Sequence, residues 1–200
     1  MPRPVVVGLS GSLRRPSRTR SLVEAIGAEV ARSRPIALLV ADLIDAGPGL
    51  GAALSRDDLS GTATELVGAI EGADALIVGS PVYKGAYTGL FKHLFDLIDP
   101  EALAGKPVVL TATGGGPRHA LVVEHSLRPL FGFFTALTVP TAVYASDQDF
   151  LDGCLVNAGV IGRLGDAARQ LAGLLDLQDR TERVEPEAPA RLAARGLRSV

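Results

Sequence analysis

Residues 5–19 read VVVGLSGSLRRPSRT, and no other part of the chain says as much about the fold. The apolar residues that open this stretch predict a short buried strand, because β-branched side chains favour extended backbone. Glycines, hydroxyl residues and arginines then crowd the turn into a helix. Small residues let backbone N–H groups point inward, and the helix N-terminus adds the positive end of its dipole. We expect this turn to hold a phosphate group; the alternative is an ordinary strand-to-helix turn with solvated arginines.

Short apolar runs alternate with helical patterns along nearly the whole chain. The helical patterns predict helices at residues 18–33, 60–72, 88–97, 118–134 and 155–177. Five strands that alternate with five helices through right-handed crossovers predict an α/β fold, a three-layer sandwich around a five-stranded parallel sheet. The apolar runs predict parallel strands, covered on both faces, at residues 4–9, 36–42, 75–80, 107–113 and 137–145.

The length of 200 residues suits one domain with a full apolar core. We expect this domain over residues 1–177, and a charged, flexible tail over residues 178–200, which carry two prolines. A net charge of −2 does not indicate binding to nucleic acid or to an anionic membrane. The single cysteine, Cys154, is interpreted as a small core residue. It suits a reducing compartment, and no signal peptide or membrane span is visible, so we expect a cytoplasmic protein.

Three loops rich in glycine, hydroxyl residues and proline follow the first, third and fourth predicted strands. The carboxyl ends of parallel strands lie on one edge of a doubly wound sheet, so these loops are expected to meet there. The first loop lacks the glycine spacing of a dinucleotide fingerprint, and the chain has no P-loop. A nest for a terminal monophosphate fits better and indicates a mononucleotide such as FMN. Its expected donors are Ser12, Arg14, Ser17 and Thr19.

The second loop reads SPVYKGAYTG at residues 80–89, and the third reads TATGGGPRH at residues 111–119. Their glycines free the backbone for close approach to a ligand. We expect amides of the second loop to reach the edge of a flavin ring beside Tyr83. Amides of the third would then reach its pyrimidine end, where negative charge accumulates on reduction. As alternatives, Tyr83 can simply cover the sheet edge, and Arg118 or His119 can be a solvated residue at a helix start.

Together these loops resemble the flavin-binding segments of the NAD(P)H-dependent FMN reductases, a family with the flavodoxin-like fold. Three motifs carry the resemblance in the same order: GSLRRPSRT at residues 11–19, SPVYKG at 80–85 and ATGG at 112–115. Segments at residues 92–98, 119–121 and 125–131 (KHLFDLI, HAL and HSLRPLF) resemble the branch that supplies reduced FMN to alkanesulfonate and methanesulfonate monooxygenases.

The resemblance implies hydride transfer from NADH or NADPH to flavin N5, and release of reduced FMN to a two-component monooxygenase of sulfur metabolism. Because the cofactors carry this chemistry, no residue is expected to act as a catalytic acid or base, and no metal is expected. The resemblance also implies a homodimer or homotetramer and a π-type bulge in the fourth helix, at His125, near a subunit interface. The expected cofactor-binding residues are Ser10, Ser12, Arg14, Ser17, Arg18, Thr19, Pro81, Val82, Tyr83, Lys84, Gly85, Thr113, Gly114, Gly115, Gly116 and His119.

Three other functions stay open at this point. An enzyme that keeps its FMN and reduces quinones, azo dyes or metal ions would use the same phosphate loop. A flavodoxin-type electron carrier is usually strongly acidic and flanks the ring with Trp or Tyr, whereas this chain has no Trp and a net charge of only −2. An interaction protein with a vestigial site would not oxidise NAD(P)H. His93 is expected to be structural or interfacial, because no His–carboxylate cluster has metal-ligand spacing.

Overall fold

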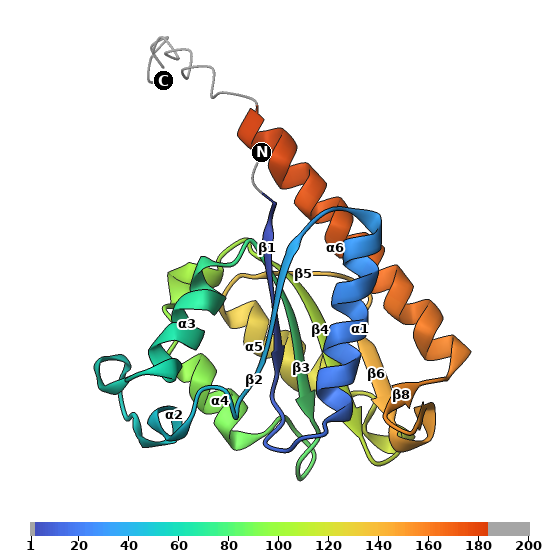
Figure 1. Cartoon of the computed structure of the whole chain (residues 1–200), viewed down its shortest axis with the longest axis horizontal. Helices are drawn as coiled ribbons and strands as arrows, with labels where there is room; N and C mark the ends of the chain where they lie inside the picture. The colour runs from blue at the N-terminus through green and yellow to red at the C-terminus, as the bar shows by residue number, and fades with distance from the viewer. Residues whose placement is uncertain (1–2, 184–200) are drawn as a thin grey trace, which may run out of the picture.

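A parallel sheet forms the middle layer of the computed structural model, which describes residues 3–183 (Figure 1). Its strand order is β2-β1-β3-β4, and the fifth position is shared by β5 and β6, which both pair with β4. The order reverses between β1 and β3, which is the flavodoxin-like arrangement. The predicted fold class is thus confirmed. The strands are β1 (Val5–Ser10), β2 (Ala37–Asp42), β3 (Ala75–Pro81), β4 (Pro107–Gly114), β5 (Leu137–Thr138) and β6 (Val143–Ser146).

The prediction of one continuous fifth strand over residues 137–145 is wrong. The ladder stops after Thr138 and resumes at Val143. Pro140 lies in the gap, and proline has no N–H to donate to a ladder. Side chains from two helices bind the backbone there instead: the Arg128 guanidinium donates to Val139 O at 3.1 Å and Pro140 O at 3.3 Å, and Thr141 N donates to Gln170 Oε1 at 2.9 Å.

Helices cover both faces of the sheet, α1 and α6 on one and α3, α4 and α5 on the other (Figure 1). Helix α1 has the predicted bounds, and its predicted face of Leu22, Ile26 and Val30 is fully buried. On the opposite face, the ring of Phe95 lies 4.8 Å from that of Phe91 and 4.9 Å from that of Phe131, centroid to centroid. The helices are α1 (Arg18–Ser33), α3 (Thr62–Gly72), α4 (Gly89–Asp96), α5 (Arg128–Phe133) and α6 (Ala158–Arg183).

The single helix predicted over residues 118–134 is also broken in the structure. A 3-10 turn at Pro117–His119 comes first, a π-helix follows at Val123–Leu127, and α5 completes the segment. His125 lies inside the π-helix, where the resemblance to the sulfonate-linked branch implied a bulge. Pro129 lies in the first turn of α5, where a helix tolerates the missing N–H.

Short elements that were not predicted complete the structure. Helix α2 (Pro48–Ala52) precedes α3, and His93 Nε2 of α4 lies 2.9 Å from Leu50 O, so His93 makes a structural contact. Strands β7 (Phe150–Leu151) and β8 (Cys154–Leu155) form a hairpin. Cys154 is exposed in this hairpin, so its interpretation as a core residue is wrong.

Helix α6 continues past Leu177, so the tail expected from residue 178 does not begin there. The guanidinium of Arg34 holds this part of the helix through Asp176 and Asp179, each at 2.9 Å. Residues 184–200 of the expected tail lie outside the described residues. Between residues 3 and 183, no helix combines the length and the apolar character needed to cross a membrane.

Candidate functional site

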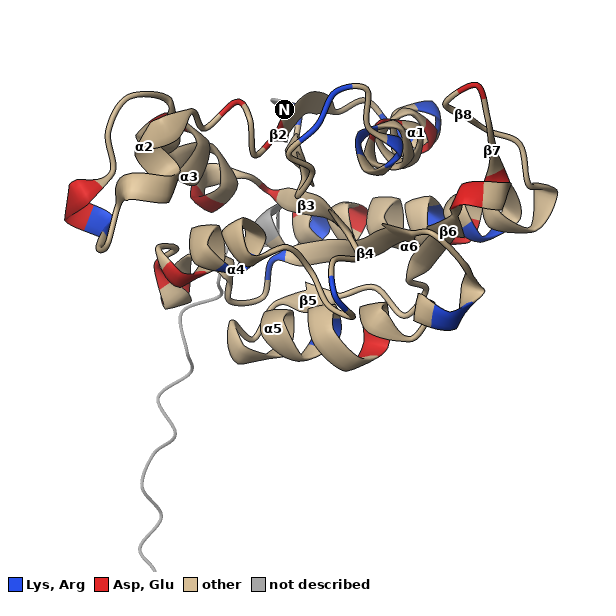
Figure 2. Ribbon diagram, turned by 90° about the horizontal axis from the view of Figure 1, so that it is seen from below, with Lys and Arg blue, Asp and Glu red and all other residues tan. Residues whose placement is uncertain are grey.

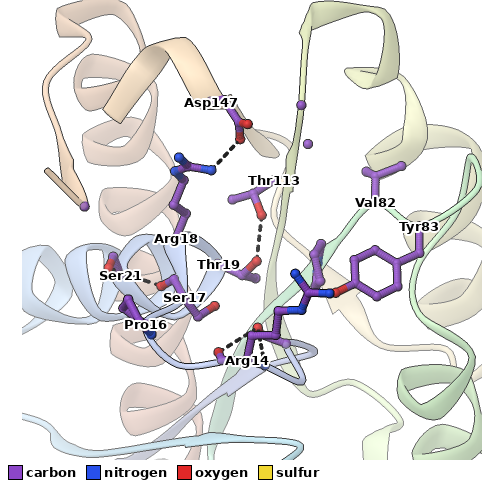
Figure 3. A pocket seen from close by; sticks show the side chains of 15 residues that line it. Arg14, Pro16, Ser17, Arg18, Thr19, Ser21, Val82, Tyr83, Thr113 and Asp147 are labelled. Atoms are coloured by element: carbon purple, nitrogen blue, oxygen red, sulfur yellow. Dashed lines mark hydrogen bonds and ion pairs between the residues drawn. The ribbon is translucent and has the colours of Figure 1, made fainter. Parts of the chain in front are cut away.

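The three loops that were predicted to converge line one pocket of about 490 Å³ at the carboxyl edge of the sheet (Figure 3). Seen from that edge, basic residues gather where the chain enters α1, and acidic residues lie around β7 (Figure 2). The loop after β6 and the β7–β8 hairpin add two further residues to the lining. The pocket is lined by Ser12, Arg14, Pro16, Ser17, Arg18, Thr19, Ser21, Pro81, Val82, Tyr83, Thr113, Gly114, Gly115, Asp147 and Gly153.

Five of the predicted binding residues are not among the lining residues. Ser10 is fully buried, and its Oγ lies 3.4 Å from Ser12 N, beneath the loop. Lys84 and Gly85 form the tip of a tight turn, with φ values of 54° and 92°. The other two, Gly116 and His119, lie farther along the third loop. Contacts of these five residues with a ligand stay predictions.

The hydroxyl groups of the first loop hold its backbone in shape. Ser12 Oγ accepts from Arg14 N at 3.2 Å and donates to Arg14 O at 3.1 Å. Ser17 is the N-cap of α1, and its Oγ accepts from Arg20 N at 3.2 Å. A serine hydroxyl that accepts one hydrogen bond keeps its own proton to donate. The Ser17 side chain can therefore cap the helix and serve a ligand at the same time.

The arginines of this loop differ in what they bind. The carboxylate of Asp42 is fully buried and accepts from Arg15 Nε at 2.8 Å and Arg20 Nη1 at 3.1 Å. The hydrogen bonds that Arg15 donates to the carboxylates of Asp42 and Asp45 raise its pKa above the ordinary value, which keeps this guanidinium charged and fixed. These two arginines therefore brace the loop and do not face the pocket as free cations.

The remaining two arginines line the pocket. Arg18 Nη1 lies 2.8 Å from Asp147 Oδ1. Arg14 has no carboxylate within salt-bridge distance in the part of the chain that the structure describes. An arginine fork without a carboxylate matches the oxygens of a phosphate group. Arg14 is thus the cation best placed to receive an anion here.

Tyr144 of β6 supports the third loop and was missed in the sequence. Its hydroxyl donates to Gly116 O at 2.6 Å. Burial raises the pKa of Tyr144, and the nearby charges of Asp147 and Asp149 add to the effect, so the hydroxyl stays protonated and able to donate. A Cβ at Gly114 would lie 2.4 Å from Tyr144 Oη. The glycine at residue 114 is therefore required by Tyr144.

Sequence reasoning also missed four lining residues. Asp147 follows the last strand of the sheet directly, so the rule that gave the other three loops could have found it. Ser21 lies one helical turn after Ser17 and so shares its face of α1. Pro16 stands within the quoted motif, whereas Gly153 reaches the pocket only because the β7–β8 hairpin folds over it.

The residues present fit a flavin mononucleotide. The N-terminus of α1, the Ser17 hydroxyl and the Arg14 guanidinium suit a terminal phosphate. Gly114 and Gly115 carry no side chain where a flat ring would approach, and nothing lies within 4 Å of a Cβ placed on Gly115. Across residues 3–183, no group of three His, Cys, Asp or Glu side chains could hold a metal ion.

His125 lies away from this pocket. With Tyr87 of the β3–α4 loop and Phe133 of α5, it lines a separate hollow of about 710 Å³ between α4 and α5. Phe133 is 71% exposed at this hollow. A role of His125 at a subunit interface stays a prediction.

Comparisons with known proteins agree with this geometry. Residues 4–150 match the model of a family described as NADPH-dependent FMN reductase. The NADH-dependent FMN reductase SfnF of Pseudomonas fluorescens is 50% identical over 175 residues, covering 87% of this chain and 94% of the relative. An FMN reductase (NADPH) of Pseudomonas aeruginosa is 49% identical over 169 residues, or 84% of this chain and 91% of the relative. A crystal structure of an oxidoreductase from Corynebacterium diphtheriae is similar with a TM-score of 0.78 at 36% identity, covering 88% of this chain and 98% of that one.

Proposed function

The chain belongs to the NADPH-dependent FMN reductase family and is an NAD(P)H-dependent FMN reductase, and from this premise we propose that it uses FMN as an exchangeable substrate and releases the reduced flavin to a separate monooxygenase. One observation carries the proposal: three loops meet in a single pocket that contains an arginine without a carboxylate partner among the described residues. When bound, FMN would supply the redox chemistry, with flavin N5 as the acceptor of the hydride from the nicotinamide.

The chain's own residues bind and orient. Arg14, Ser17 and the N-terminus of α1 receive the phosphate, while the backbone of Val82 and Tyr83 and the loop at Gly114 border the ring. Holding two rings at contact distance accounts for the rate, and no side chain is assigned as a catalytic acid or base.

An exchangeable flavin distinguishes this proposal from an enzyme that keeps its FMN. The two phosphate-facing arginines lie at the surface, Arg18 with a half-exposed side chain. We expect the purified protein to be largely colourless and its NAD(P)H oxidation to saturate with added FMN. A tightly held flavin that survives gel filtration, with turnover independent of added FMN, would contradict the proposal.

The partner that fits best is a flavin-dependent monooxygenase that cleaves sulfonates or sulfones. The support is the resemblance of residues 92–98 and 125–131 to the sulfonate-linked branch, and the π-helix found at Val123–Leu127. The test mixes the protein with a flavin-dependent alkanesulfonate monooxygenase, FMN, NADH or NADPH and oxygen. Sulfite release that requires this protein is expected. Oxidation of NAD(P)H without sulfite release would contradict the sulfur link.

We also propose a homo-oligomer. The exposed Phe133 and the apolar hollow beside it give α5 a surface that suits burial against another copy. Sedimentation velocity at several protein concentrations tests this directly. A dimer or tetramer is expected, and a monomer at every concentration would contradict it.

A further inference from the structure

We propose that Asp147 weakens the binding of the flavin phosphate by competing for Arg18, and so keeps FMN exchangeable. The inference rests on the proposed function, in which FMN enters and leaves the pocket at each turnover. It assigns a specificity-determining role to a carboxylate that lies inside an anion-binding pocket.

The carboxylate of Asp147 is brought to the pocket by a fixed turn. Ser146, the last residue of β6, caps this turn: Asp149 Oδ2 accepts from Ser146 N at 2.7 Å and from Ser146 Oγ at 2.8 Å. Asn157 Nδ2 adds a bond to Asp149 Oδ1 at 2.7 Å. Asp147 is the first residue of this anchored 3-10 turn, so its position is set by the fold.

Arg18 meets this carboxylate from the opposite side. It is the first residue of α1, and its Nη1 lies 2.8 Å from Asp147 Oδ1 (Figure 3). Both side chains line the pocket and are about half exposed, 49% for Arg18 and 52% for Asp147. The pair can therefore open without breaking the core.

The contrast with Asp42 separates a structural pair from an exchangeable one. Asp42 is fully buried and binds Arg15 and Arg20 at once, so removing it would leave a loop without its brace. Asp147 is the acidic side chain among the residues that line the pocket. Of the two arginines that line the pocket, Arg14 forms no salt bridge within residues 3–183, whereas Arg18 forms one with Asp147.

Electrostatics sets the direction of the effect. A phosphate that binds Arg18 must displace Asp147 and then lies beside a carboxylate without a partner, which repels it. A phosphate that leaves the ion pair intact loses its attraction to the Arg18 guanidinium. Either outcome weakens binding of a dianion. In a half-exposed site such an effect amounts to a few-fold, because solvent screens the charges. Riboflavin has no phosphate, so its binding should not depend on Asp147.

The test compares Asp147→Asn with a matched control, Asp152→Asn. Asp152 is exposed in the β7–β8 hairpin that follows the turn of Asp147, and it lies outside the lining residues. Its φ is 49°, which asparagine tolerates well. The dissociation constants of FMN and of riboflavin are measured for wild type and both variants, at low and high salt. We expect D147N to bind FMN about three- to tenfold more tightly, with riboflavin unchanged and the gain reduced at high salt. We expect D152N to match wild type.

Two results would overturn the inference. Unchanged or weaker FMN binding by D147N would mean that Asp147 merely orients Arg18. Equal tightening for FMN and riboflavin would mean that the substitution changes packing and not phosphate recognition. Turnover of the wild type distinguishes this failure from a failure of the proposed function. If the wild type reduces added FMN with saturation kinetics and D147N does not bind FMN more tightly, only the role of Asp147 is contradicted. A wild type that does not use added FMN defeats the proposed function itself.

Discussion

Thr19 and Thr113 meet across the pocket, with their hydroxyl oxygens 2.6 Å apart and both side chains buried (Figure 3). Thr19 belongs to the first turn of α1 and Thr113 to the end of β4. If the phosphate binds at the start of α1, as proposed, this contact joins that segment to the strand that carries the glycine loop. A buried hydrogen bond between side chains thus links two of the segments that line the pocket.

Replacing either threonine by valine leaves the other hydroxyl buried without this partner. We expect Thr113→Val to lower the free energy of unfolding by about 1–3 kcal/mol, the usual cost of such a group. The double variant with Thr19→Val should lose less than the sum of the two single losses, because no hydroxyl is then left unpaired. Urea unfolding of all four proteins measures this. Strictly additive losses would contradict the coupling.

Gly114→Ala tests the support of the third loop by Tyr144. The new Cβ would lie 2.4 Å from Tyr144 Oη but 3.4 Å from Cζ, so the hydroxyl is the clashing atom. We expect G114A to raise the KM for FMN several-fold, and Tyr144→Phe in the same chain to restore part of the loss, because it removes the clashing oxygen together with its hydrogen bond to Gly116 O. Gly68→Ala in α3 is the matched control, since nothing lies within 4 Å of its Cβ and it is not among the residues that line the pocket. Failure of Y144F to rescue would show that the glycine is needed for another reason.

Arg14→Gln tests the assignment of the phosphate. A charge-assisted hydrogen bond contributes about 1.5–3 kcal/mol, so the KM for FMN should rise roughly tenfold or more while that for riboflavin changes little. Arg32→Gln, an exposed arginine in the last turn of α1, serves as the control for loss of positive charge. Equal losses for FMN and riboflavin in R14Q would place the phosphate elsewhere.

The ion pair of Glu71 and Arg56 makes stability depend on pH in the acid range. Hydrogen bonds from Arg56, with Nη2 at 2.6 Å from Glu71 Oε2, hold the pKa of Glu71 below its ordinary value of 4.5. The folded state then binds the proton less readily than the unfolded chain, so the stabilisation is full above about pH 4.5 and is lost as the pH falls through the lower folded value. Urea unfolding should show Glu71→Gln less stable than wild type at pH 7, with the difference shrinking below pH 4.5.

Glu65→Gln provides the comparison for this pH series, because Glu65 is exposed on the same helix. It should follow wild type through the acid range. A difference between wild type and E71Q that stays constant down to pH 3 would show that the carboxylate does not contribute through its ionisation.

Local sequence patterns were sufficient to predict the order of strands and helices in this fold and many of the residues of the site. The apolar runs predicted as strands at residues 4–9, 75–80 and 107–113 placed three loops on one edge, and the spacing of apolar residues gave α1 its bounds. The break in the fifth strand had one local signal, Pro140 itself, but the contact of its carbonyl with Arg128 joins two separate elements. Contacts of this kind depend on tertiary packing, which the local pattern does not contain.

The unpredicted parts of the site have the same origin. The position of Asp147 could have been predicted, because loops that follow parallel strands meet at the carboxyl edge of the sheet. Its pairing with Arg18 could not, because it joins residues 129 positions apart. The Asp-Gly turn at residues 152–153 is a recognisable hairpin signal, and using it would have placed Cys154 on a strand of a hairpin. The role of Tyr144 required the position of Gly114 in space.

The measurement that tests the central claim most directly is anaerobic stopped-flow mixing of the flavin-free protein with free FMN and each nicotinamide. We expect the visible absorbance of FMN to bleach with NADH, NADPH or both, at a rate that saturates as free FMN is raised. No bleaching with either nicotinamide, or bleaching only of a flavin that stays on the protein through gel filtration, would contradict it.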